Sequence, residues 1–156
     1  MNLLLAVLLI STSFAPGATV PVSMIAAPCG GENISPQVRW EGAPAGTVSW
    51  ALILHDPDAP HPGGFYHWVA YGLPAGTRML RAGETLADKR SGRNDAGSTG
   101  YFGPCPPPGK LHHYVLTLYA LDRAIEAPSA LTAAELLQRI RGHVLAQASL
   151  TVVLKR

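Results

Sequence analysis

The sequence predicts a mainly β domain in which one α-helix packs against the sheet. Three observations favour this fold class. The chain carries 16 glycines and 14 prolines among its 156 residues, which is typical of strands joined by many turns. Several segments alternate apolar and polar residues with the two-residue period of a strand. One segment near the C-terminus has helical spacing, so the order is strands, a long loop, a strand, a helix and a strand.

The apolar run Leu3–Ile10 has two interpretations. Small residues follow at positions 15–18, as in a short signal peptide, but no Lys or Arg precedes the run. The run is too short to cross a bilayer as a helix. Residues 8–11 could instead form the first strand. We therefore divide the chain into residues 1–7, an N-terminal extension or part of a signal segment, and residues 8–156, a single domain.

Two strands are predicted in the first half of the chain. Thr47–His55 alternates strongly, and Asp56 continues the parity of its apolar positions. Tyr66–Leu73 is rich in aromatic and β-branched residues and predicts a second strand. Residues 82–110 lack periodicity and contain many Gly, Asp, Asn and Pro, so we expect a long irregular connection there.

His113–Leu121 gives the clearest strand pattern. Its even positions are more uniformly apolar and should face the core. If His112 is also extended, it lies with Tyr114 at the rim of the core, and His113 points to the opposite side.

A helix is predicted over Thr132–Gln147, where Thr132 and Glu135 form a capping box. On this interpretation His143 lies on the helix. Ser149–Leu154 follows as the last strand. The expected apolar stripe of the helix consists of Ala133, Leu136, Leu137, Ile140 and Val144.

Charge and cysteine content argue against several classes of function. Net charge is +2 and no run of Lys or Arg is present, which argues against nucleic-acid binding. The two cysteines, Cys29 and Cys105, are too few for a cysteine zinc site and too far apart for a CxxC redox motif. They could form a disulfide or remain buried free thiols.

Rigid Pro/Gly loops place polar side chains in two parts of the sequence. The first holds Asp56 and Asp58 and leads to His67; the second leads to His112 and Tyr114. Imidazole and phenol groups donate hydrogen bonds, and a nearby carboxylate fixes a histidine tautomer. Donors that converge in an apolar rim suit a small oxyanion such as a phosphate, a phosphate ester or a carboxylate.

Other interpretations of the same residues remain open. The two aspartates could bond only to their own turn, and the histidines could be ordinary half-buried residues. His67, His112 and Asp56 could bind a metal, although no HxH or HExxH spacing is present. A His–Asp pair near Tyr114 could do acid–base chemistry, but no GxSxG, Walker A or GxGxxG motif occurs. We therefore expect no catalytic residue, metal or cofactor.

The chain resembles the phosphatidylethanolamine-binding protein family, in particular its bacterial branch, called Raf kinase inhibitor-like. The resemblance runs from about residue 8 to the C-terminus. The motifs that carry it are, in order, Gly31-Glu32-Asn33-Ile34-Ser35-Pro36, Trp40, Pro44-Ala45-Gly46-Thr47, Asp56-Pro57-Asp58-Ala59-Pro60, His67-Trp68, Gly100-Tyr101, Pro106-Pro107, and His112 with Tyr114.

The resemblance implies a central antiparallel β-sheet packed on a smaller sheet, with one helix in the C-terminal region, and an anion pocket at one end. The loop from Gly103 to Pro107 should supply a wall of the pocket. The chain departs from the family at His113, where Arg is usual, so an outer salt bridge could be lost, and at Phe65, where many members have Trp. The implied ligand-binding residues are Asp56, Asp58, Pro60, His67, Gly103, Pro106, His112 and Tyr114.

The resemblance also sets the expected partners. A small anionic ligand and a protein partner, such as a kinase or protease, are expected, and related bacterial members suggest a homodimer. Phospholipid headgroups are disfavoured, because the C-terminal segment that shapes lipid access in eukaryotic members has no counterpart here. Cleavage at positions 15–18 would remove the family's first strand. This favours a cytoplasmic protein, or a periplasmic one if the apolar run is a signal peptide.

Overall fold

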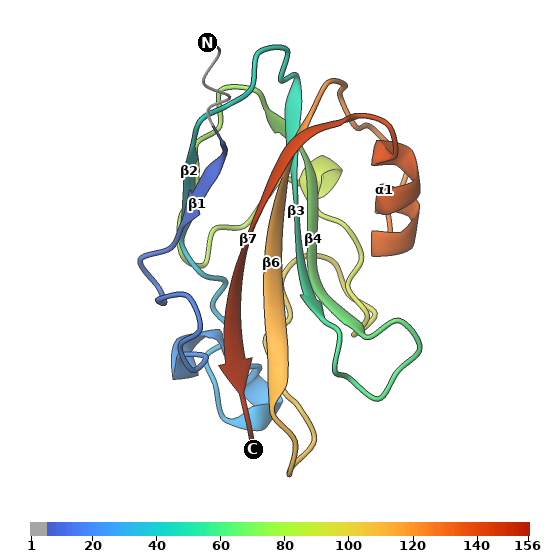
Figure 1. Ribbon diagram of the computed structural model, residues 1–156. Coiled ribbons are helices and arrows are strands. Elements are labelled where there is room, and N and C mark those ends of the chain that lie inside the picture. Colours follow the sequence, from blue (N-terminus) through green and yellow to red (C-terminus); the bar gives the residue numbers. More distant parts are fainter. Residues whose placement is uncertain (1–5) are drawn as a thin grey trace.

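The computed structural model describes residues 6–156, which form two antiparallel β-sheets and one α-helix (Figure 1). The predicted fold class is therefore confirmed. The smaller sheet has the order β1-β2-β5, with β1 at Leu8–Ile10, β2 at Val38–Glu41 and β5 at Met79–Leu80. The larger sheet has the order β4-β3-β6-β7, with β3 at Ser49–Asp56, β4 at Phe65–Pro74, β6 at His112–Leu121 and β7 at Val144–Leu154.

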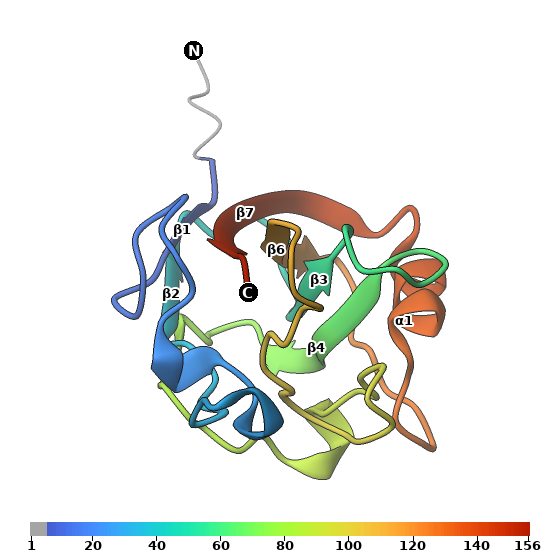
Figure 2. The same ribbon diagram turned by 90° about the horizontal axis from the view of Figure 1, so that it is seen from below.

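The larger sheet is covered on both faces. Seen from below, the smaller sheet lies on one side and α1 (Ala133–Ile140) on the other (Figure 2). Trp50, Leu52 and Leu54 of β3 belong to the core cluster that also contains Trp40 of the smaller sheet. Ala51 and Ile53 belong to the cluster under the helix. Burial on both faces explains why β3 is apolar at nearly every position.

The predicted parity of β6 is confirmed. Tyr114, Leu116 and Leu118 are fully buried in the core between the sheets. His112 belongs to the strand and is only 2 % exposed, whereas His113 is exposed on the other face.

The predicted helix is wrong at its C-terminal end. Thr132 caps the helix as expected, and its capping box with Glu135 is complete. The helix ends at Ile140, however, and Gly142 follows with a φ of 79°, a left-handed conformation that favours glycine. Val144 already pairs with Leu121 of β6, so β7 is longer than predicted.

His143 consequently lies in the turn and not on the helix. Its Nδ1 lies 2.8 Å from the Asp122 carboxylate, to which it donates a hydrogen bond. Val144, expected in the buried stripe of the helix, is exposed at the start of β7.

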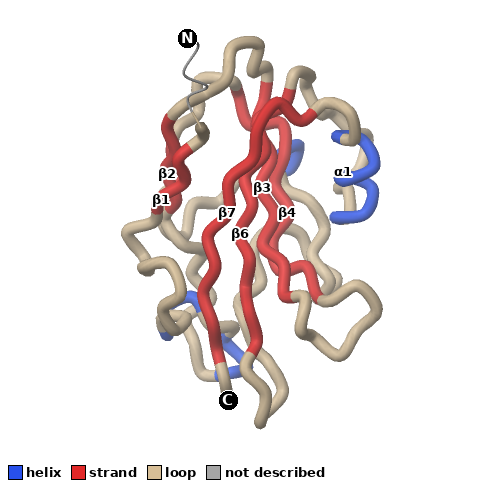
Figure 3. Tube along the Cα trace, viewed as in Figure 1, coloured by secondary structure: helices blue, strands red, loops and turns tan. Residues whose placement is uncertain are grey.

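Loops fill the remaining sequence (Figure 3). Residues 82–110 contain one short 3-10 helix, η3 (Asp88–Arg90), and are otherwise irregular, as predicted. Two more 3-10 turns, η1 (Val22–Met24) and η2 (Ala27–Cys29), follow β1. Within residues 6–156, no helix is long and apolar enough to cross a membrane.

Candidate functional site: a histidine-lined pocket at one end of the larger sheet

The predicted polar residues meet where β3 ends and where β4 and β6 begin. The antiparallel register pairs Asp56 with Phe65 and His55 with Val115. Because neighbouring antiparallel strands end and begin at the same edge, Asp56, His67 and His112 lie together despite their distance in sequence.

Asp56 and His112 form a buried pair. The His112 Nδ1–H donates to Oδ2 of Asp56 at 2.7 Å, and each residue is 2 % exposed. The other Asp56 oxygen accepts the Asp58 backbone N–H at 2.9 Å. Both carboxylate oxygens are therefore satisfied, and the His112 ring is held with Nε2 free of any hydrogen bond to residues 6–156.

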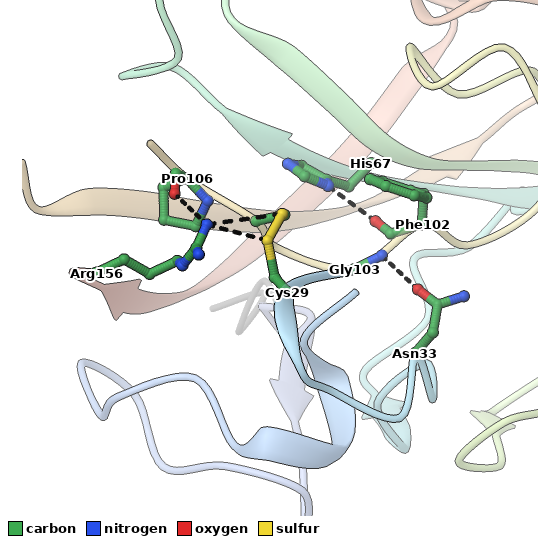
Figure 4. Close-up of a disulfide and its surroundings, with 8 residues drawn as sticks. Cys29, Asn33, His67, Phe102, Gly103, Pro106 and Arg156 are labelled. Carbon is green, nitrogen blue, oxygen red and sulfur yellow. Dashed lines mark hydrogen bonds between the residues drawn. A yellow bond between two sulfur atoms is a disulfide. The ribbon is translucent and has the colours of Figure 1, made fainter. Parts of the chain in front are cut away.

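His67 is held in a comparable way by the backbone. Its Nδ1–H donates to the Phe102 carbonyl at 2.8 Å (Figure 4), and the Phe102 N–H donates to the His67 carbonyl at 2.9 Å. Burial lowers the pKa of His67 below its ordinary value of 6.5, although the Phe102 carbonyl and the Asp56 charge oppose this shift. A neutral His67 with Nδ1 protonated presents a free Nε2 lone pair.

Tyr114 contributes a buried hydroxyl to the pocket. Its ring lies edge-on to His67, with ring centroids 5.3 Å apart. The hydroxyl oxygen is buried and makes no hydrogen bond within the described part of the chain. Burial, reinforced by the Asp56 charge, raises the pKa of Tyr114, so the group remains an O–H donor.

These side chains share one pocket with a volume of about 320 Å³. Of the eight residues expected to bind ligand, Asp56, Pro60, His67, Pro106, His112 and Tyr114 line it, and Asp58 and Gly103 do not. The lining also includes Ala59, His61, Phe65, Phe102, Cys105 and Pro107. Sequence reasoning named the loop to which Phe102 and Cys105 belong, but it gave His61 no role.

Asp58 instead faces outward and binds His113. Its Oδ2 accepts the His113 backbone N–H at 2.8 Å and the ring Nδ1–H at 2.7 Å. His113, which stands where Arg is usual in the family, therefore still has a hydrogen-bond partner on this face. These two hydrogen bonds lower the pKa of Asp58. They also tie the loop after β3, which carries Pro60 and His61, to the start of β6.

Replacing His113 by alanine should raise the pKa of Asp58 part of the way to its ordinary value of 3.8, because the ring donor is lost and the backbone donor stays. A carboxyl-detected NMR titration measures this. Since folding lowers the Asp58 pKa, the pair stabilises the fold above pH 3.8 and loses its contribution as the pH falls through the lowered pKa. His143→Ala, which removes the Asp122 pair instead, should leave Asp58 unchanged; an unaltered Asp58 pKa in His113→Ala would contradict the assignment.

Gly103 supports the pocket from behind. Its backbone N–H donates to the Asn33 side chain at 2.7 Å (Figure 4). The neighbouring Pro104 carbonyl accepts the Ala26 N–H at 3.0 Å. A Cβ at Gly103 would collide with the Met24 carbonyl, so the two chain segments pack backbone to backbone. The wall loop is thereby fixed on the N-terminal segment.

Cys29 and Cys105 form a disulfide with a Cα–Cα distance of 5.7 Å. The structure therefore has a disulfide here and not the two buried free thiols that the sequence also allowed. The bond joins η2 to the pocket wall. No group of three or more His, Cys, Asp or Glu side chains within residues 6–156 is arranged to hold a metal ion.

Comparisons with known proteins agree with the fold and with the motifs. A family model described as phosphatidylethanolamine-binding protein matches residues 10–155. The chain belongs to this family. The chain is similar to the UPF0098 protein YbhB of Escherichia coli, with 41 % identity over 130 residues, which cover 79 % of this chain and 82 % of YbhB.

Two solved structures of bacterial family members superpose closely. Escherichia coli YbcL, described as a new member of the mammalian family, matches with a TM-score of 0.89 and 30 % identity over 96 % of this chain and 98 % of YbcL. A phosphatidylethanolamine-binding protein homologue from Chlamydia trachomatis matches with a TM-score of 0.87 and 32 % identity, covering 97 % of this chain and 99 % of that one. Both matches span the pocket-forming strands and loops of this family member.

Proposed function

We propose that this protein is a non-enzymatic module that binds a small oxyanion, such as a phosphate, a phosphate ester or a carboxylate, in the pocket at the end of the larger sheet. The observation that carries the proposal is the Tyr114 hydroxyl. It is buried beside the pocket and makes no hydrogen bond within residues 6–156. A buried donor without a partner costs roughly 1–3 kcal/mol, and an anion oxygen would supply the missing acceptor.

The charges in the pocket favour an anion once His67 is protonated. The negative charge of Asp56 is already engaged by the His112 N–H and the Asp58 backbone N–H. His67 has a lowered pKa, so it is largely neutral at pH 7. On protonation its Nε2–H becomes a hydrogen-bond donor beside the Tyr114 hydroxyl. A bound anion would favour this protonated form, so binding is coupled to proton uptake.

The walls suit a small ligand with an apolar or flat substituent. Phe65, Phe102, Pro106 and Pro107 flank the polar end of the pocket. Apolar walls exclude water and strengthen the hydrogen bonds made inside. A volume of about 320 Å³ is at the lower end of the range for small-molecule sites.

Acid–base chemistry at the Asp56–His112 pair is the second candidate, because the geometry of the pair suits a general base. We favour binding over catalysis because the pocket lining contains no Ser, Thr or Lys, and the sulfur of Cys105 is held in the disulfide. In the proposed role, ligand binding in the pocket affects how the module binds a protein partner, such as a kinase or protease that it inhibits.

Sulfate titration followed by NMR of the imidazole signals tests the proposal, because sulfate keeps the same charge between pH 5 and 8. Saturable shifts of His67 and His112 are expected. Affinity should fall as the pH rises through the His67 pKa of the complex, by up to about tenfold per pH unit for the one linked proton. His67→Gln should remove this linked proton, and Tyr114→Phe should weaken binding at every pH.

His143→Gln is the matched control. This ring contacts Asp122 and Arg123 beyond the far end of β6, so its loss should leave sulfate affinity and its pH dependence unchanged. The absence of saturable shifts at millimolar sulfate and phosphate would refute the anion pocket. Release of product from a phosphate or carboxylate ester, lost in His112→Gln, would favour the enzyme instead.

A further inference from the structure

The Cys29–Cys105 disulfide is placed where it can control the pocket. Cys105 lies in the pocket lining, and Cys29 ends η2 in a segment 76 residues earlier in the chain. Both cysteines are partly exposed, so a thiol in solution can reach the bond. The chain has two cysteines, so a thiol reagent has one target.

The loop between Cys105 and the site is short. Phe102, whose carbonyl orients the His67 ring, lies three residues before Cys105, and Pro106 and Pro107 of the apolar wall follow directly. The earlier part of this loop has further anchors, because Gly103 bonds to Asn33 and Pro104 to Ala26. Within residues 6–156, the segment from Cys105 to Gly109 is held by the disulfide to Cys29, by the Arg156 side chain at Pro106, and by the Gly109 N–H, which donates to the Arg156 carbonyl at 2.8 Å.

Arg156 lies beside the sulfur atoms (Figure 4). Its Nη1 is 3.1 Å from the Cys29 sulfur and 4.0 Å from the Cys105 sulfur, and it donates to the Pro106 carbonyl at 3.2 Å. A neighbouring guanidinium stabilises a thiolate, the form that leaves when a disulfide is attacked and that attacks when it re-forms. The same side chain therefore contacts both the disulfide and the pocket wall.

We infer that the Cys29–Cys105 disulfide is a redox latch that holds the pocket wall in its binding conformation, so that reduction weakens ligand binding. The inference rests on the proposed anion-binding function. A dithiol reductant attacks one sulfur and forms a mixed disulfide, and the other cysteine leaves as a thiolate. The second thiol of the reductant then closes its own disulfide, which leaves two cysteine thiols after transfer of two electrons and two protons.

The latch acts on part of the wall. In the reduced protein, the hydrogen bonds of Phe102, Gly103 and Pro104 remain, so the orientation of His67 should survive. The segment from Cys105 to Pro107 should become mobile. Ordering it again on binding should reduce affinity roughly three- to tenfold, the cost of immobilising one or two groups at the site.

The test compares sulfate affinity in the oxidised protein, in the protein reduced with dithiothreitol and in the protein reoxidised with oxidised glutathione. Thiol titration confirms each state. Amide hydrogen exchange of Cys105, Gly109 and Lys110, the residues of this segment that have a backbone N–H, measures its mobility independently of the ligand. Weaker binding and faster exchange after reduction, both reversed by reoxidation, are expected. The Cys29→Ser/Cys105→Ser double variant should have the sulfate affinity of the reduced protein, and dithiothreitol should not change that affinity.

The outcomes separate the latch from the binding function. Equal sulfate affinity in fully oxidised and fully reduced protein would overturn the latch and leave the anion module standing. Binding in neither state would refute the anion module, and the latch with it. Two titratable thiols in protein kept under air with no reductant would also overturn the latch, because the bond would not form.

Discussion

Replacing Asp56 by alanine is expected to lower the free energy of unfolding by about 2 to 5 kcal/mol, because two donors then lose their acceptor in a buried site. The donors are the His112 ring N–H and the Asp58 backbone N–H. Urea denaturation measures the change. The same variant should bind sulfate more weakly, since the His112 ring is no longer held.

Asp56→Asn is the matched variant. The amide oxygen can still accept the Asp58 N–H, and the amide NH₂ can donate to Nδ1 of His112 if the ring proton moves to Nε2. We therefore expect less than half of the destabilisation seen with alanine, together with a reversed His112 tautomer in ¹⁵N NMR spectra. Equal destabilisation by both substitutions would contradict the role given to the two hydrogen bonds.

Replacing Gly103 by alanine should have an effect of similar size, about 3 kcal/mol, through steric overlap rather than a lost charge. The new Cβ would overlap the Met24 carbonyl oxygen and lie 2.6 Å from the Ala26 nitrogen. Both are main-chain atoms that cannot rotate away, so the wall loop must separate from the N-terminal segment. Urea denaturation of the oxidised protein should show a lower midpoint with an unchanged slope.

Gly76→Ala is the control for this substitution. Gly76 lies in an exposed turn where a Cβ would have no atom within 4 Å, and its φ is outside the left-handed region. The stability of this variant should stay within about 1 kcal/mol of the parent protein. If Gly103→Ala is as mild as Gly76→Ala, the two segments are not packed as tightly as the structure shows.

Strand patterns in the sequence were reliable where one face of the strand is buried. The alternation of β6 predicted that His112 and Tyr114 share the core side and that His113 points away, and the structure confirms it. The cap of the helix at Thr132 was equally clear, because a capping box depends on residues within one turn.

Sequence patterns failed where pairing with a distant strand competes with local propensity. Residues 144–147 have helical spacing and helix-forming residues, yet they belong to β7. Pairing with β6, beginning at Leu121 and Val144, satisfies their backbone groups instead. Gly142 was the local signal for the end of the helix, since glycine adopts positive φ without strain.

The sequence by itself determined the fold class, the strands that carry the site and the pairing of Pro/Gly loops with histidines, because these follow from residue periodicity and turn chemistry. Tertiary structure alone decided which carboxylate serves the pocket. Asp56 and Asp58 were both expected to bind ligand, but the end of β3 directs Asp56 to His112 and leaves Asp58 to His113. It also decided that Cys29 meets Cys105 across 76 residues, since a long-range contact depends on how the chain packs and not on local pattern.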